Sequence, residues 1–236
     1  MKQGMMQKTT FTADSSGQVL EWTGNGEYLR VEAWGADSVR VRAAKMHPVE
    51  EQNWALLSHS KSQSYADSAS QATIQIDDEN RTAILRNGKI EVKAVVNAWD
   101  CSCHLSFLKV TEDGTLAPLF QERPSGGSLQ LKARDYQAII GGDEKITASF
   151  EALEDEHLYG MGEYQNTPLN LKGSTLELAH RNSQASVPFV LSSAGYGFLW
   201  NNPAIGRVSF SRNVTQWVAD SSRQLDYWVT AGDSPA

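Results

Sequence analysis

The sequence predicts an all-β chain, folded as one large antiparallel β-sandwich of roughly fifteen or more strands. Short segments in which apolar and polar residues alternate recur along the chain. Turn-forming residues separate such segments about every 8–12 residues in the C-terminal part. Helical patterns between strands are missing, which excludes a βα barrel and a Rossmann domain from this chain. The 236 residues are expected to form a single domain, 1–236.

The first half of the chain contains the clearest alternation. "EYLRVEAW" (27–34) and "SVRVRAA" (38–44) follow the pattern of half-buried strands, and the second places valine and alanine on one face and arginines on the other. The turn residues "GAD" join them into a hairpin. Further strands are predicted at "ATIQID" (72–77), "TAILRN" (82–87) and "KIEVKAVV" (89–96), with "NGK" (87–89) as a hairpin turn. Residues 47–72 have no clear period, so a long loop, a short helix and a mobile excursion all stay open.

The second half continues in the same manner, with short apolar segments separated by glycine-rich and acidic turns. Four strands are predicted in the middle of the chain: "CHLSFLKV" (103–110), "TLAPLF" (115–120), "SLQLKA" (128–133) and "KITASFEA" (145–152). Five more follow within about fifty residues: "VPFVLSS" (187–193), "YGFLWNN" (196–202), "GRVSF" (206–210), "TQWVAD" (215–220) and "LDYWVT" (225–230). Such density is typical of a β-meander or sandwich.

Composition and charge narrow the range of partners. A net charge of −7 and a pI near 5.3 argue against binding to nucleic acid and to an anionic membrane surface. The N-terminus has no apolar signal segment and no stretch is long enough to span a bilayer, so a cytoplasmic protein is expected. Cys101 and Cys103 are expected to be free structural thiols, because cytosolic disulfides are rare. Only His104 lies nearby, so no metal site is predicted, and no motif indicates a cofactor.

The stretch "YGMGEYQNTPLNLKG" (159–173) is the first candidate for function. Gly160 and Gly162 flank Met161, and glycines at alternate positions indicate a bulge, a positive φ or a close approach of backbone. Glu163 is a lone carboxylate, whereas the usual hydrolysis of a glycosidic bond needs two. We therefore expect Glu163 to accept hydrogen bonds from backbone donors or to pair with an arginine, and no catalytic residue is assigned.

A second candidate is the polar cluster in "LELAHRNSQASVPF" (176–189). His180, Arg181 and Asn182 lie between an apolar segment and a predicted strand. Their side chains could donate hydrogen bonds to sugar hydroxyl groups. A solvated loop with a capping asparagine explains the same residues equally well.

Three motifs in one order give the sequence a family resemblance. "LYGMGE", "VPFVLSSAGYGFLWNN" and "DYWVTAGDSPA" look like the N-terminal region of glycoside hydrolase family 31, which contains α-glucosidases and α-xylosidases. The resemblance is strongest over residues 157–236, and residues 1–156 are similar to its N-terminal sandwich, of galactose-mutarotase-like fold, by pattern only. It implies that a (β/α)8 barrel with both catalytic aspartates of a retaining mechanism follows Ala236. It also implies that a loop of this domain helps to close the substrate pocket, and makes Arg181 and Asn182 the candidates for substrate binding.

Three functions follow from these observations. The first is a non-catalytic N-terminal domain that packs on the barrel and contacts a carbohydrate substrate. The motifs between residues 169 and 189 are slightly more similar to those of bacterial α-xylosidases than to those of intestinal α-glucosidases. The second is an aldose mutarotase, which needs a general acid and base for which His104, His157 and Glu163 are available. The third is a free-standing carbohydrate-binding module, which needs exposed tryptophans, whereas the alternation suggests that Trp200, Trp217 and Trp228 are at least partly buried. A homo-oligomer is compatible with the sequence.

Overall fold

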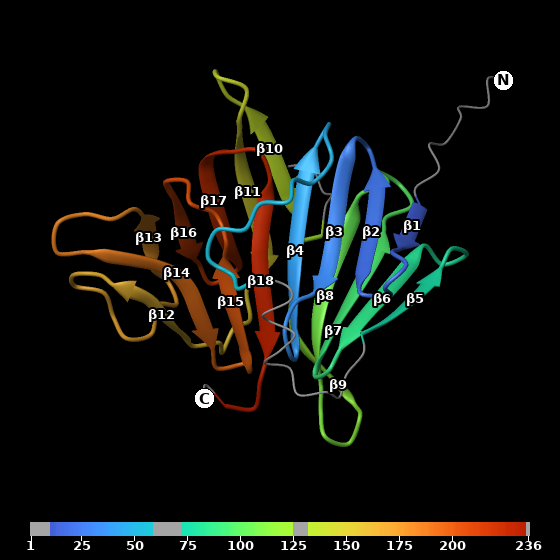
Figure 1. Cartoon of the computed structure of the whole chain (residues 1–236). Helices are drawn as coiled ribbons and strands as arrows, with labels where there is room; N and C mark the ends of the chain where they lie inside the picture. Colours follow the sequence, from blue (N-terminus) through green and yellow to red (C-terminus); the bar gives the residue numbers. More distant parts are fainter. Residues whose placement is uncertain (1–9, 59–71, 125–131, 235–236) are drawn as a thin grey trace.

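The computed structural model describes residues 10–58, 72–124 and 132–234, and all regular secondary structure in these ranges is β-strand. Within these ranges, eighteen strands form three sheets in which all neighbours run antiparallel. One eight-stranded sheet forms a layer that packs against the other two sheets, which lie side by side behind it (Figure 1). The predicted all-β antiparallel sandwich is therefore confirmed.

The eight-stranded sheet has the order β1-β2-β3-β4-β18-β15-β14-β12 and brings both halves of the chain together. The β4–β18 pairing joins them, since Val39 lies opposite Val229 and Val41 opposite Tyr227. The strands are β1 (Thr10–Ala13), β2 (Val19–Gly24), β3 (Glu27–Ala33), β4 (Ser38–Lys45), β12 (Leu158–Glu163), β14 (Ala185–Ser192), β15 (Tyr196–Trp200) and β18 (Leu225–Ala231).

The second layer consists of two five-stranded sheets. One is a simple meander of β5 (Thr73–Asp77), β6 (Thr82–Asn87), β7 (Ile90–Val96), β8 (Cys103–Val110) and β9 (Leu116–Gln121). The other has the order β10-β11-β17-β16-β13, with β10 (Arg134–Ala138), β11 (Glu144–Glu151), β13 (Thr175–Leu178), β16 (Gly206–Phe210) and β17 (Val214–Ser222). The hairpin turn predicted at "NGK" joins β6 to β7, where Asn87 pairs with Ile90.

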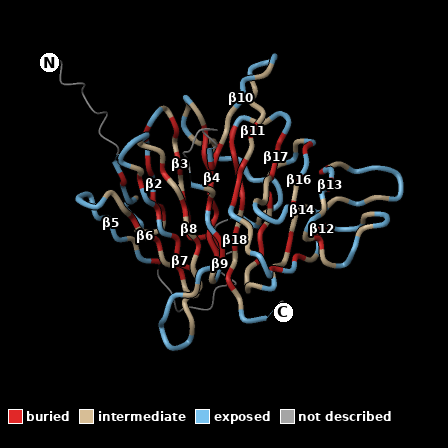
Figure 2. Tube along the Cα trace, turned by 180° about the vertical axis from the view of Figure 1, so that it is seen from behind, coloured by how far each residue is buried: buried red, intermediate tan, exposed pale blue. Residues whose placement is uncertain are grey.

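The core lies between the two layers and is rich in aromatic rings. Phe198 stacks on both Trp217 and Tyr227, with ring centroids 5.0 Å apart in each pair. Trp200 and Trp217 are each only 1% exposed, and Trp228 is half-buried, so the burial expected of these tryptophans is confirmed. Buried residues follow the middle of the strands, and exposed residues gather in the connections and at the projecting ends of β12 and β13 (Figure 2).

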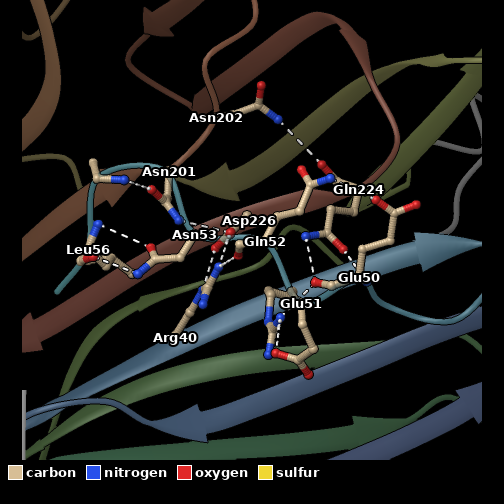
Figure 3. A network of polar contacts seen from close by, with 12 residues as sticks. Arg40, Glu50, Glu51, Gln52, Asn53, Leu56, Asn201, Asn202, Gln224 and Asp226 are labelled. Atoms are coloured by element: carbon tan, nitrogen blue, oxygen red, sulfur yellow. Dashed lines mark hydrogen bonds and ion pairs between the residues drawn. The ribbon is translucent and has the colours of Figure 1, made fainter. Parts of the chain in front are cut away.

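Strand β4 differs from its predicted half-buried state, because both of its faces are buried. Arg40 and Arg42, expected on an outer face, are 1% and 0% exposed. Residues 46–58, which we call the covering segment, cross this face without forming a helix or strand (Figure 3). The Arg42 guanidinium donates to the carbonyl oxygen of Glu50 in the covering segment at 2.8 Å and pairs with Glu32 at 2.6 Å. Of the three alternatives for residues 47–72, a loop without regular secondary structure is therefore present over residues 47–58. Residues 59–71 lie outside the described residues.

Five strands, β1, β2, β10, β12 and β13, were not predicted from the sequence. The predicted strand at 128–133 lies mostly outside the described residues; its last two positions are irregular, and β10 begins directly after them. β12 contains two glycines and β13 has only four residues, so neither shows a sustained alternation. Their pairing partners, β14 and β16, hold them in place.

Candidate functional site

The stretch 159–173 begins in β12, an edge strand whose pairing with β14 contains a bulge. The register shifts between Gly160 and Gly162, and both glycines have positive φ, 110° and 89°. A Cβ atom on Gly162 would lie 2.3 Å from the carbonyl oxygen of Ala185, and one on Gly160 would lie 2.7 Å from that of Phe189. The bulge, the positive φ and the close backbone approach expected here are all present, so these glycines have a structural role.

Arg181 and Asn182, the expected sugar contacts, lie in the turn between β13 and β14. The N–H groups of Arg181 and Gln184 donate to each other's carbonyl oxygens at 3.3 and 3.1 Å. Ser183 has a φ of 63°, and a positive φ at the second central residue alone is the pattern of a type II turn. Asn182 is the first central residue, is exposed, and makes no side-chain hydrogen bond with the described residues, so it does not cap this loop. Both side chains are therefore presented to solvent at the tip of the turn.

Contacts of two side chains, Arg181 and Tyr164, support the shape of this turn. Arg181 Nε donates to Oε2 of Glu177 at 2.8 Å, between side chains that are 59% and 48% exposed. Such an exposed pair stabilises the fold by at most about 1 kcal/mol. The hydroxyl group of Tyr164 lies 2.8 Å from the carbonyl oxygen of Glu177 and 2.7 Å from Oγ of Ser186. The connection after β12 is thus attached to the strands that carry the turn.

Glu163 does not have the structural role expected for it. Its side chain is exposed and makes no hydrogen bond or ion pair with the described residues. The reason is its position at the end of β12, the outermost strand of the sheet, which leaves no neighbour on that side. His157 lies just before the other end of β12, roughly 20 Å away at about 3.3 Å per residue, so it forms no acid–base pair with Glu163.

His104, the third residue considered for proton transfer, lines a separate cavity of about 250 Å³. Burial lowers the pKa of His104, and the charge of nearby Glu122 only partly opposes this. Glu27 lines the same cavity but accepts hydrogen bonds from Arg134 Nε at 2.6 Å and from the Tyr136 hydroxyl at 3.0 Å. Because both hydrogen bonds are made to Oε1 of Glu27, this oxygen is already engaged and is poorly placed to remove a proton from a sugar.

Arg134 is the centre of this buried cluster, which the sequence analysis missed. Its guanidinium contacts Glu27 and Glu122 and donates to the carbonyl oxygen of Cys103 at 2.6 Å. Although burial opposes the charged form, the two carboxylates raise the pKa of Arg134 well above its usual value. One feature of the sequence indicates this cluster, because the alternation of residues 27–33 puts Glu27 on the same face as the core residues Leu29 and Val31. A charged residue on a core face needs a buried partner.

The two cysteines are free thiols, as predicted. Cys101 lies in the turn before β8 with a φ of 52°, and Cys103 begins that strand. Burial raises the pKa of the Cys103 thiol, which keeps it protonated. Among the described residues, no group of three histidine, cysteine, aspartate or glutamate side chains is arranged to hold a metal ion. Within the same residues, no helix has the length and apolar character needed to cross a membrane.

Comparisons in sequence and structure place the chain among family 31 glycosidases. The model of the glycosyl hydrolase 31 N-terminal galactose mutarotase-like domain matches residues 28–208. The uncharacterized family 31 glucosidase ORF2 of Pseudescherichia vulneris is 42% identical over 228 residues, which are 91% of this chain and 40% of that protein. Alpha-xylosidase A of Aspergillus niger is 31% identical over 229 residues, 94% of this chain and 30% of that protein.

The fold agrees with these sequence relationships. The crystal structure of a GH31 α-xylosidase from a soil metagenome, complexed with xylose, superposes with a TM-score of 0.80 at 39% identity and covers 96% of this chain and 33% of that one. The chain thus spans about a third of the length of the relatives that it matches. The profile match covers more than half of the chain, and the expected sandwich is present. The chain belongs to glycoside hydrolase family 31, as its N-terminal galactose mutarotase-like domain.

Proposed function

We propose that this chain is the non-catalytic N-terminal domain of a retaining α-glycosidase that hydrolyses α-xylosides. The observation that carries the proposal is the similarity of more than nine-tenths of the chain to proteins named α-xylosidase, in sequence and in structure. α-Glucosides are the second substrate class, because a relative at 42% identity is named a glucosidase. In this proposal the catalytic barrel lies in the part of the enzyme that follows the sandwich.

The projecting end of the sandwich is the part that we assign to the substrate pocket. Arg181 and Asn182 present free donors there on a turn supported by Tyr164. Two large apolar side chains of the same end are also exposed, Leu169 at 83% and Val187 at 50%. Exposed apolar groups beside polar ones are typical of a contact surface. We therefore assign Leu169 and Val187 to packing on the barrel, and Arg181 and Asn182 to the sugar.

Hydrolysis of p-nitrophenyl α-D-xyloside and p-nitrophenyl α-D-glucoside tests this proposal. The chain alone is expected to hydrolyse neither substrate, and the protein extended into the following region is expected to hydrolyse the xyloside faster. Hydrolysis by the chain alone would contradict the non-catalytic role. An extended protein that hydrolyses neither would contradict the assignment to α-glycosidases, and a preference for the glucoside would replace the first substrate class by the second.

Two other functions remain as alternatives, with less support. A mutarotase would have to use the His104 cavity, where the carboxylate of Glu27 is engaged by Arg134 and Tyr136; an anomerisation assay with α-D-glucose measures this activity. A free-standing carbohydrate-binding module would need exposed tryptophans. Trp200 and Trp217 are in the core, whereas Trp54 and Trp99 are exposed. Calorimetry with oligosaccharides measures that binding.

The proposal includes two features of the whole protein. A cytoplasmic location fits two cysteines that stay unpaired, as is usual in a reducing compartment. Cell fractionation with an antibody against the chain tests it, and recovery from the periplasm or medium would contradict it. Homo-oligomers of the complete enzyme are the second feature, and analytical ultracentrifugation over a range of concentrations tests them; a monomer at all concentrations would contradict them.

A further inference from the structure

The covering segment holds an exposed tryptophan in a fixed position. Trp54 is 58% exposed, yet the backbone on both sides of it is anchored to the sheet beneath. The carbonyl oxygen of Gln52 accepts a hydrogen bond from Arg40, which is itself 1% exposed. The N–H of Ala55 donates to Oδ1 of Asn201, also 1% exposed, at 3.0 Å (Figure 3). The indole of Trp54 is therefore presented by a rigid segment, at a small entropic cost for binding a ligand.

A cavity of about 330 Å³ opens beside Trp54. Segments that are distant in the sequence meet there: the covering segment, the β10–β11 turn with Asp143, the β15–β16 connection with Asn202 and the β17–β18 turn with Arg223. Its volume lies at the lower end of the range for small-molecule sites, about 300–1,000 Å³. The cavity is thus large enough for one small ring and is built from several elements of the fold.

The polar side chains of the cavity are oriented by their neighbours and keep unused hydrogen-bonding capacity. Asp143 accepts a hydrogen bond from the Ser221 hydroxyl at 2.6 Å, and its other carboxylate oxygen accepts none from the described residues. Arg223 Nε donates to Glu50 at 2.6 Å, and a guanidinium has four further N–H donors. Such preoriented donors and acceptors can bind hydroxyl groups, which both donate and accept hydrogen bonds.

Charge decides which class of ligand fits. Three carboxylates line the cavity, on Glu50, Asp143 and Asp226, against the single guanidinium of Arg223. A phosphate or carboxylate ligand would therefore be repelled. The buried Arg40 pairs with Asp226 at 2.6 Å and Arg223 pairs with Glu50 at 2.6 Å, so Asp143 is the carboxylate of the cavity that has no cation beside it among the described residues. A neutral ligand rich in hydroxyl groups, with one apolar face for the indole, satisfies both the charge and the aromatic surface.

We propose that this cavity binds a neutral saccharide, with a pyranose ring stacked on Trp54 and its hydroxyl groups bonded to Asp143 and Arg223. The inference goes beyond the proposed function, because it concerns binding by this chain itself and does not depend on which glycosidic bond is hydrolysed.

Calorimetry and NMR with the chain test the proposal, using xylotriose and maltotriose as neutral probes and glucose 6-phosphate as the anionic one. At least one neutral probe is expected to bind and to shift the indole N–H signal of Trp54, assigned by its absence in Trp54→Phe. Trp54→Ala is expected to weaken binding about tenfold, equivalent to about 1.4 kcal/mol of lost ring contact. Trp54→Phe keeps an aromatic face and is expected to lose less. Circular dichroism checks that each variant is folded.

Trp99→Ala is the matched control, because Trp99 is 97% exposed in the β7–β8 turn and does not line the cavity. Its affinity for the neutral probes is expected to equal that of the parent chain. The proposal is overturned if no neutral probe binds, if glucose 6-phosphate binds more tightly, or if Trp54→Ala and Trp99→Ala have equal effects. It is also overturned if the shifted signals belong only to the Arg181 turn. Hydrolysis by the longer protein bears on the proposed function alone, so the two can fail separately.

Discussion

Replacing Arg134 by methionine tests the account of the buried charge cluster. In the native fold the guanidinium lies 2.6 Å from a carboxylate oxygen of Glu27 and 2.6 Å from one of Glu122, and it is 6% exposed. Methionine fills much of the volume but leaves two buried carboxylates without their cation. Removing one member of a buried ion pair costs about 3–5 kcal/mol, because the remaining charge stays desolvated. For a chain of this size each kcal/mol lowers the Tm by about 2–4 °C, so we expect a decrease of roughly 6–20 °C.

Urea unfolding of the variant and of the parent chain, followed by tryptophan fluorescence, measures this loss in the free energy of unfolding.

The matched control is Lys132→Met, which removes a cation from the same cavity. The Lys132 side chain is 66% exposed and lies 3.8 Å from Asp135, so the expected cost is below about 1 kcal/mol. The reasoning is refuted if Arg134→Met costs no more than this control.

Three further predictions follow from single sites. Gly162→Ala should destabilise the fold by more than Gly17→Ala in urea unfolding, because both glycines have positive φ but only Gly162 has a backbone oxygen 2.3 Å from the added Cβ; the strain alone costs about 1–2 kcal/mol, and equal losses would contradict the close approach. His104→Gln should reduce the loss of stability that the chain undergoes between pH 7.5 and 5.5. Burial lowers the pKa of His104 in the folded state below 6.5, so the contribution of the neutral imidazole to the free energy of unfolding is fully present above pH 6.5. This contribution is lost as the pH falls toward the folded-state pKa, with a slope of at most about 1.4 kcal/mol per pH unit. An unchanged pH dependence of urea unfolding in this variant would argue against that burial effect. Asn182→Ala should change the free energy of unfolding by at most about 0.5 kcal/mol, as is typical of surface changes, but raise the KM of the extended enzyme several-fold. Asn213→Ala, which replaces an exposed asparagine in the β16–β17 turn, should change neither quantity. An unchanged KM in Asn182→Ala would remove Asn182 from the substrate pocket.

The strands that sequence patterns predicted well are those in which the alternation of apolar and polar side chains is enough to determine which face is buried. In β3, β6, β7 and β8, apolar residues recur at every second position, and the hydrophobic effect puts that face into the core in any arrangement of the sheets. The glycines of β12 also carried local information, because their missing Cβ atoms permit the bulge wherever the partner strand lies. The family resemblance rested on short sequence motifs of this kind, and the comparisons confirmed it.

The sequence alone therefore determined the all-β class, the hairpins, the bulge and the family. Only the tertiary structure decided that Arg40 and Arg42 are buried, because this depends on the covering segment, which has no period of its own. It also decided that Glu27, Glu122 and Arg134, separated by up to 107 positions, form one cluster, and that Trp54 lies beside a polar cavity. Residue patterns report the face on which a side chain lies, whereas partners and cavities depend on which distant segments meet there, and that is a property of the assembled sheets.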